Sequence, residues 1–372
     1  MIKTIKNTGL FFVLLFVFCV NSIYPHPAWG IVVDRQKQVY FSDLETVWKI
    51  DQQGNLSIFR EGVSGRHVHA LTIDAEGNIH GLDNSFNPQT QKFPRSIWKM
   101  TPSGEFSYLV SPTDDLPPGE SIWRDSGGNT YSVEPFNNEK KETKIIKKSP
   151  DGKTSLLAGG KYGYFDGQKD KAEFTVITDM AFGKDNTIYV TNDDKVRKID
   201  KSGTVTTIYR EESPNINQES LEPFSRLFGL TVDEQNNVFV ADFYNNRLLK
   251  ISSDGKVSLI LNSEKDWSPI GVTANNDEIY VLEARPYSSE VHTGNRVVKI
   301  ASDGKSTVIA SMEEAVKPKD SSNKNDDSSS LETVNTSSSS EPSSQNNWLI
   351  LLGVIGAVGA AFAAFIILVK RK

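Results

Sequence analysis

The sequence predicts an all-β fold, a six-bladed β-propeller of four-stranded antiparallel blades, followed by a C-terminal transmembrane helix. Three observations predict it: a lysine–glycine pattern that recurs about every 50 residues, four short strand-like segments in each recurrence, and one long apolar run near the end of the chain. Of the 372 residues, 37% are hydrophobic and 10% aromatic, which is enough to bury a sizeable core.

The repeat is marked by a glycine five residues after a lysine. The six glycines are Gly54, Gly104, Gly152, Gly203, Gly255 and Gly304. Within one unit, such as residues 229–261, short apolar segments alternate with turns rich in Asp, Asn and Gly, which tolerate the positive φ of tight hairpins. Four strands per unit, repeated six times without helical segments, predict a propeller over residues 29–311. The sixth unit is complete, so we expect the ring to close without strand exchange.

One column of the repeat lies in the middle of each second strand. It holds Tyr40, His80, Tyr131, Tyr189, Phe239 and Tyr280. Because five of the six are aromatic, we interpret His80 as a core ring that replaces an aromatic one. The repeated lysines are expected on exposed third strands, where their stems cover apolar surface.

The two ends of the chain carry membrane signals. Residues 1–22 predict a signal peptide, with Lys3 and Lys6 before a short apolar run. Residues 312–347, rich in Ser, Asn and Asp, predict a flexible stalk. Residues 348–369 carry no charge and are long enough to span a bilayer, and the basic residues 370–372 predict a cytoplasmic tail. The expected protein is a single-pass protein of the cell membrane with its propeller on the extracytoplasmic side.

Two stretches of the repeat resemble a known family. Residues 158–208 (AGGKYGYFDGQKDKAEFTVITDMAFGKDNTIYVTNDDKVRKIDKSGTVTTI) and 237–248 (NVFVADFYNNRL) are similar to NHL-type repeats, which have a glycine-rich opening, a YVAD-like strand and an RKI-like strand. The resemblance implies a six-bladed propeller, a shape shared with gluconolactonase-like and strictosidine-synthase-like proteins. Since that shape serves several chemistries, the resemblance does not fix a reaction.

The connections predict which face of the propeller is functional. Hairpins between first and second strands, and between third and fourth strands, are short in every unit, whereas the long connections gather on the opposite face. Long loops on a rigid scaffold are where binding and catalysis concentrate. We therefore expect ligand contacts on this loop-rich face, around the central channel. The candidate residues are Trp29, His67, His69, Glu120, Tyr164, Tyr244, Arg285 and Tyr287.

Two functions of different classes fit these residues. The preferred one is a binding module that recognises a protein, peptide or glycan and contains no cofactor, because no complete catalytic set is present. The alternative is a metal-dependent hydrolase or lyase of the gluconolactonase-like or amidating-lyase-like type, with calcium or zinc held by Glu120 and His69. Phe228 and Ile270 stand where the gluconolactonase resemblance implies metal ligands, and neither can coordinate a metal.

Composition excludes other classes. The net charge of −6 argues against a nucleic-acid partner, which calls for a basic surface. The single cysteine, Cys19, excludes an intramolecular disulfide and a cysteine-based zinc site. A ring of acidic and amide residues at the second-strand exits could suggest a calcium cage. We interpret it as scaffolding in which these side chains accept backbone N–H bonds in the adjoining turns.

Overall fold

The computed structural model describes residues 28–312 apart from residues 88, 91, 117–121, 135–140, 212–226, 265 and 286–293. The predicted signal peptide, the stalk beyond Met312 and the helix at 348–369 lie outside the described residues. Within the described ranges, no helix has the length and apolar character needed to cross a bilayer.

The described chain forms six antiparallel sheets, one per repeat unit. Blade 1 consists of β1 (Ile31–Val33), β2 (Val39–Ser42), β3 (Val47–Ile50) and β4 (Leu56–Arg60). Blade 2 consists of β5 (Arg66–Ile73), β6 (Ile79–Ser85), β7 (Arg95–Met100) and β8 (Phe106–Thr113). Blade 3 consists of β9 (Ile122–Arg124), β10 (Thr130–Glu134), β11 (Lys144–Lys148) and β12 (Thr154–Ala158).

The second half of the ring repeats the pattern with one addition. Blade 4 consists of β14 (Ile177–Phe182), β15 (Ile188–Asn192), β16 (Lys195–Ile199) and β17 (Thr204–Arg210). The two-residue β13 (Gly167–Gln168) pairs with its outer edge, and the 3₁₀ turn η1 (Lys169–Lys171) follows β13 before the chain enters β14. Blade 5 consists of β18 (Leu227–Val232), β19 (Val238–Asp242), β20 (Arg247–Ile251) and β21 (Val257–Asn262). Blade 6 consists of β22 (Ser268–Asn275), β23 (Glu278–Ala284), β24 (Asn295–Ile300) and β25 (Ser306–Ser311).

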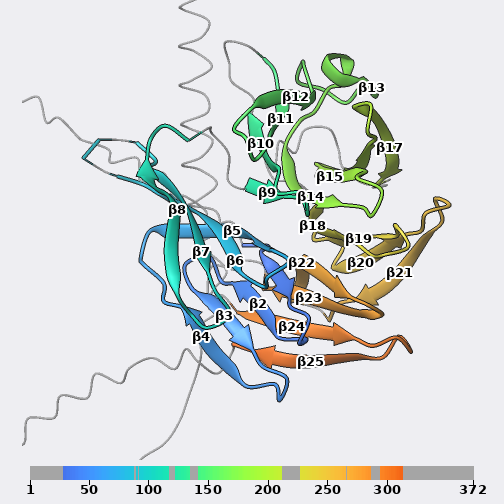
Figure 1. Ribbon diagram of the computed structural model, residues 1–372. Coiled ribbons are helices and arrows are strands. Elements are labelled where there is room, and N and C mark those ends of the chain that lie inside the picture. The colour runs from blue at the N-terminus through green and yellow to red at the C-terminus, as the bar shows by residue number, and fades with distance from the viewer. Residues whose placement is uncertain are drawn as a thin grey trace, which may run out of the picture. The chain divides into compact units, whose positions relative to one another are not determined.

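This arrangement confirms the six-bladed propeller of four-stranded antiparallel blades. The first strands converge on the centre of the ring, as the labels of β5, β9, β14, β18 and β22 show in Figure 1. The ring closes where β1 packs against β22. Blade 1 and blade 6 each consist of four consecutive strands, so neither blade borrows a strand from the other end of the described chain, as expected.

The short hairpins are held by one recurrent turn chemistry. In blade 2, Asp74 Oδ1 accepts hydrogen bonds from the backbone N–H groups of Glu76 and Asn78, and Asp74 Oδ2 accepts one from the Asn78 side chain. Gly77 has a φ of 83°, which glycine adopts without strain. Equivalent Asp–Asn pairs close the hairpins at Asp125 and Asp233. The tight-hairpin face is therefore built from polar turn residues.

The aromatic column of the second strands is a structural feature, as predicted. Tyr131 donates a hydrogen bond to Asp125 Oδ2 at 2.8 Å, and His80 Nε2 contacts Asp74 Oδ2 at 2.9 Å in the same manner. His80 thus takes the place of a tyrosine in the column. The repeated lysines do more than cover apolar surface, because Lys147 Nζ lies 5.7 Å from the centre of the Tyr131 ring. The same cation–π pairing recurs in blades 1, 5 and 6.

Candidate functional site

Large exposed hydrophobic side chains are unevenly distributed between the two faces of the propeller. One set lies on the fourth, outermost strands: Ile58, Phe106, Tyr108, Leu109, Val257, Leu259 and Val308. The other set lies in the connections of the loop-rich face: Val63, Phe86, Phe93, Tyr162, Tyr164, Phe165, Val176 and Tyr244. Among the described residues, none lies in the tight hairpins. The two faces therefore differ in chemistry as well as in loop length.

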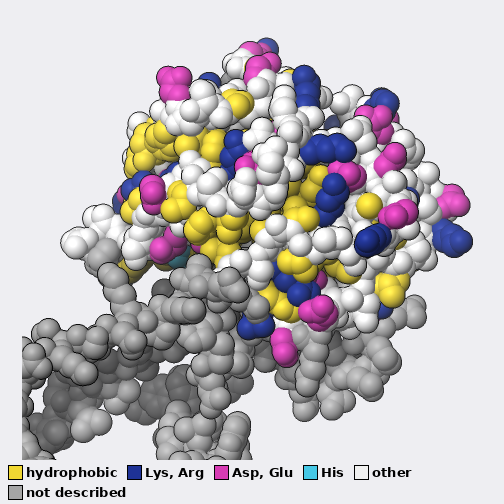
Figure 2. Space-filling view, turned by 90° about the horizontal axis from the view of Figure 1, so that it is seen from below, with side chains coloured by type: hydrophobic (Ala, Val, Ile, Leu, Met, Phe, Trp, Pro, Cys, Tyr) yellow, Lys and Arg dark blue, Asp and Glu magenta, His cyan; other side chains and the backbone are white. Residues whose placement is uncertain are grey.

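The space-filling view shows how the charged side chains are arranged on one side of the molecule. Lys and Arg side chains are interspersed there with Asp and Glu, and hydrophobic side chains gather in small patches between them (Figure 2). A surface of mixed sign fits the modest net charge of the chain. On that side no extended basic stripe of the kind that binds nucleic acid is visible.

The most exposed aromatic group belongs to the connection between β12 and β14. Its anchor is Arg197 of β16, whose side chain is completely buried. The guanidinium donates to the backbone carbonyls of Phe165 and Glu173 at 2.9 and 3.0 Å, and to Asp166 Oδ1 at 2.7 Å. One buried cation thus fixes the path of residues 165–173, and it leaves the Phe165 side chain 72% exposed.

Tyr164 is held on the same connection by polar contacts. Its hydroxyl donates to Asp193 Oδ2 at 2.9 Å, and Lys195 Nζ lies 3.8 Å from the centre of its ring. Partial burial and the negative charge of Asp193 raise the pKa of the Tyr164 hydroxyl to about 12, so this side chain is neutral at physiological pH. The ring remains 46% exposed.

The predicted channel-mouth residues Trp29 and His69 are packed together below the surface. Trp29 and His69 are 5% and 1% exposed, and their rings stack with centroids 5.4 Å apart. Phe228 adds a ring 6.1 Å from Trp29, and His67 meets His69 edge-on at 5.9 Å. This aromatic cluster fills the loop-rich end of the channel, so Trp29 and His69 are not surface contacts in this conformation.

The remaining predicted residues are separated on the ring. Tyr244 is 46% exposed on the turn after β19, and its ring meets Phe243 edge-on at 5.9 Å. The Arg285 guanidinium lies 5.0 Å from the centre of the Trp267 ring. Glu120 and Tyr287 lie outside the described residues. The prediction for these two positions therefore stays a prediction.

The residues at the second-strand exits are engaged in local contacts. Asp43 accepts two backbone N–H bonds in its turn, as expected. Three others depart from that expectation: Asp83 pairs with Arg60 at 2.7 Å, Asp242 with Arg247 at 2.7 Å, and Glu283 with Arg296. These acids pair with arginines because they are buried, and buried carboxylates need charged partners. Across the described residues, no group of three or more His, Cys, Asp or Glu side chains is arranged to hold a metal ion.

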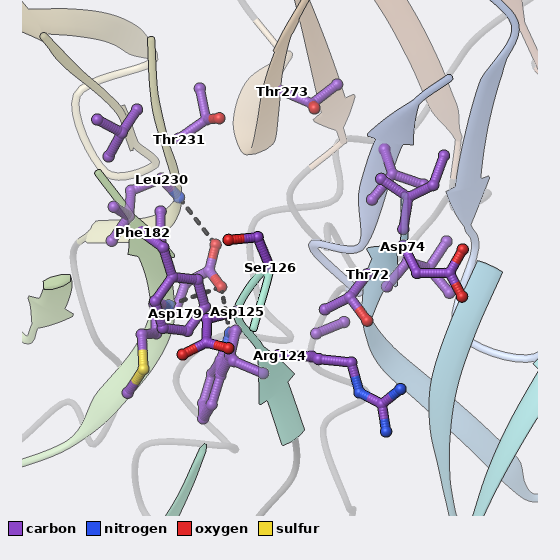
Figure 3. A pocket seen from close by; sticks show the side chains of 18 of the residues that line it. Thr72, Asp74, Arg124, Asp125, Ser126, Asp179, Phe182, Leu230, Thr231 and Thr273 are labelled. Carbon is purple, nitrogen blue, oxygen red and sulfur yellow. Dashed lines mark hydrogen bonds between the residues drawn. The ribbon is translucent and has the colours of Figure 1, made fainter. Parts of the chain in front are cut away.

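A cavity of about 750 Å³ occupies the central channel (Figure 3). It extends from the Trp29 and Ala70 level to the hairpin turns of blades 2, 3 and 4, including Asp74, Ser126 and Asn186. The described cavity therefore reaches the tight-hairpin end of the channel. The sequence predicted the functional rim at the opposite end.

Asp179 is the distinctive residue of this cavity. Its Oδ1 accepts from Trp123 Nε1 of blade 3 at 2.7 Å and from the Met180 N–H at 2.8 Å, and its Oδ2 accepts from the Leu230 N–H of blade 5 at 2.9 Å (Figure 3). One carboxylate thus joins three blades. Burial raises the pKa of Asp179 to about 6, and the three hydrogen bonds only partly oppose this shift.

Sequence reasoning missed Arg197 and the linking role of Asp179. Arg197 stands in the RKI-like strand, where its type suits a solvent-facing repeat residue, and only the folded connection shows it buried. The partners of Asp179 come from blades about 50 residues away on either side. No local pattern reports such contacts.

Comparisons with known proteins show similarity in fold. No family model and no curated protein matches the chain, so the NHL resemblance stays a prediction. Virginiamycin B lyase from Staphylococcus aureus is 16% identical with a TM-score of 0.45, over 76% of this chain and 83% of that one. A gluconolactonase from Xanthomonas campestris is 13% identical with a TM-score of 0.47, over 69% and 83%. A luciferin-regenerating enzyme is 16% identical with a TM-score of 0.49, over 73% and 90%. These likenesses carry no argument about the chemistry of this chain.

Proposed function

We propose that this protein is a membrane-anchored binding module that recognises a protein, peptide or glycan through the loop-rich face of an extracytoplasmic propeller. The observation that carries the proposal is the segregation of exposed aromatic side chains. Apart from Phe106 and Tyr108 on the fourth strand β8, those described stand in connections of the loop-rich face, and none stands in the tight hairpins. Exposed aromatic side chains are enriched where proteins contact their ligands.

The anchoring of the aromatic connection supports this proposal. Arg197 fixes residues 165–173 through its hydrogen bonds, and Asp193 and Lys195 orient the Tyr164 ring. A contact surface that is rigid before binding loses little conformational entropy on binding. The Phe165 side chain is therefore exposed on a backbone segment that the Arg197 side chain holds in place.

The test compares two sets of variants of the full-length chain on the surface of its host cell. Tyr164→Ala with Phe165→Ala removes exposed aromatic surface from the loop-rich face. Leu259→Ala, at a fourth-strand residue that is 57% exposed, is the matched control. Proximity labelling should recover the same partner with the wild-type chain and with the control, and lose it with the double variant. Equal recovery with all three chains would refute the proposal, and labelling confined to cytoplasmic proteins would refute the topology.

The alternative function, a metal-dependent hydrolase or lyase, has its own test. Asp179 is a titratable carboxyl group in the channel wall, the kind of group that general acid–base chemistry uses. Metal analysis of the purified full-length chain separates the two functions. Stoichiometric calcium or zinc that is lost on Glu120→Ala or His69→Ala would overturn the preference for the binding module and favour the alternative.

A further inference from the structure

The junction between blades 2 and 3 is built differently from the other five. Apolar clusters fill the junctions of blades 1 and 2, 3 and 4, 4 and 5, 5 and 6, and 6 and 1. Among the described residues, no such cluster joins blade 2 to blade 3. A cavity of about 300 Å³ lies there instead, lined by residues of both blades.

Two departures from the repeat coincide at this junction. The first hairpin of most blades begins with an Asp or Asn, and the residue just before it is apolar. This apolar residue packs in the same cluster as the aromatic-column residue of the preceding blade. The pairs are Ile73 with Tyr40, Val232 with Tyr189, and Val33 with Tyr280. At the junction of blades 2 and 3 the corresponding residues are Arg124 and His80. Both partners of the pair therefore depart from the repeat at the junction that contains this cavity.

The polar groups of this cavity are available to a ligand. Arg124 and Lys148 both line it, and neither forms an ion pair or a side-chain hydrogen bond with any residue that the structure describes. The lining contains no Asp or Glu. Arg124 is half-buried and also lines the central cavity, and Lys148 is exposed, so an anion here would pair with two cations that no carboxylate of this lining neutralises.

His80 supplies a second unsatisfied group. Its side chain is 6% exposed, Nε2 contacts Asp74, and Nδ1 is buried without a hydrogen-bond partner among the described residues. Burial lowers the pKa of His80, and the positive charges of Arg124 and Lys99 lower it further, although Asp74 opposes them. Neutral His80 that donates from Nε2 to Asp74 presents Nδ1 as an acceptor. The remaining walls combine the apolar side chains of Ile97, Leu109, Val110, Ile122 and Pro150 with the hydroxyl-bearing residues Thr72, Thr130 and Ser149.

From this combination we infer that the junction of blades 2 and 3 is a binding site for a small organic carboxylate that has an apolar body and a hydrogen-bond donor. The carboxylate pairs with Arg124 and Lys148, the donor meets His80 Nδ1, and the apolar body fills the space that apolar side chains fill at other junctions. Pockets of this size and composition are typical of small-molecule sites. The inference concerns the interior between two blades, and it does not depend on the function proposed for the loop-rich face.

The test uses three related probes on the full-length chain: mandelate, its uncharged amide and phenylacetate, which lacks the hydroxyl group. Isothermal titration should show mandelate binding at least about tenfold more tightly than the amide, as expected for one charge-assisted hydrogen bond. Arg124→Gln should weaken that preference, with Lys148 as the remaining cation, and His80→Phe should reduce mandelate to the affinity of phenylacetate. Lys184→Gln is the control, because Lys184 lines the central cavity and not this one.

A double variant guards against a trivial loss of folding. His80→Tyr with Arg124→Val restores the pattern of the other blades, so the chain should unfold at the same or a higher temperature than wild type while losing all mandelate binding. Equal affinity for mandelate and its amide, an unchanged preference in Arg124→Gln, or no binding of any probe would overturn the inference. Binding of inorganic phosphate in preference to mandelate would also overturn it and would identify a site for a free oxyanion.

Discussion

Replacing Asp179 by asparagine tests whether burial in the wall of the central channel destabilises the ionised form of this carboxyl group. The pKa of Asp179 is raised from 3.8 to about 6 by burial, so the folded protein holds this proton more tightly than the unfolded chain does. Stability from this group is fully present below about pH 4 and is lost as the pH rises through 6. At about 1.4 kcal/mol per pKa unit the whole shift corresponds to about 3 kcal/mol, and we expect about 2 kcal/mol because the side chain faces an open cavity.

Asparagine keeps the shape of the side chain and removes its ionisation. The free energy of unfolding of Asp179→Asn, measured relative to wild type, should therefore rise by about 2 kcal/mol between pH 4 and pH 7. Any constant cost of a lost hydrogen bond cancels in this comparison. Urea denaturation of the full-length chain, followed by tryptophan fluorescence at several pH values, measures it. Asp185→Asn is the control, because hydrogen bonds lower the pKa of Asp185 and confine its effect to below about pH 4. A difference that stays flat across this range would refute a raised pKa at Asp179.

Three further outcomes are expected. Lys299 and other partners lower the pKa of Glu278 to about 2. The stability that Glu278 confers is therefore present above pH 4.5 and is lost as the pH falls. The melting temperatures of Glu278→Gln and wild type should converge toward pH 2. Replacing buried Arg197 by methionine should cost about 3 to 5 kcal/mol in urea denaturation, and should open residues 159–176 to limited proteolysis; full protection there would contradict its anchoring role. A methyl group on Gly81 would collide with the Trp98 ring, so Gly81→Ala should lower the free energy of unfolding by about 1 to 3 kcal/mol, and an unchanged value would show that this packing is looser than described.

The sequence was sufficient to predict the fold because the fold is a repeat. Each blade needs the same hairpin turns and the same buried faces, so six imperfect copies of one pattern reinforce one another. The interpretation of His80 as a column residue followed from five aligned aromatic residues, and the contact of His80 Nε2 with Asp74 confirms it. The same comparison of copies predicted ring closure without strand exchange.

The candidate site could be predicted only in part, because exposure and partners depend on distant contacts. Tyr164 and Tyr244 are exposed on the loop-rich face, whereas Trp29 and His69 at the channel mouth are stacked below the surface. Local sequence places all four near one end of the channel, but it does not reveal that Phe228 completes a buried cluster there. Burial is a property of the assembled ring.

The two faces of the propeller differ for a physical reason that also bears on function. Every tight hairpin needs Asp, Asn or Gly to close its turn, so the chemistry of that face is largely set by the fold and little of it is left for recognition. The long connections carry no such requirement and can present aromatic rings such as Phe165 once a buried group such as Arg197 supports them. The same reasoning applies to His80 and Arg124 at the junction of blades 2 and 3. Apolar side chains fill the other five junctions, so the ring does not need a polar pair there in order to close. Departures from the repeat, more than its preserved positions, are therefore where specific binding is to be sought in this chain.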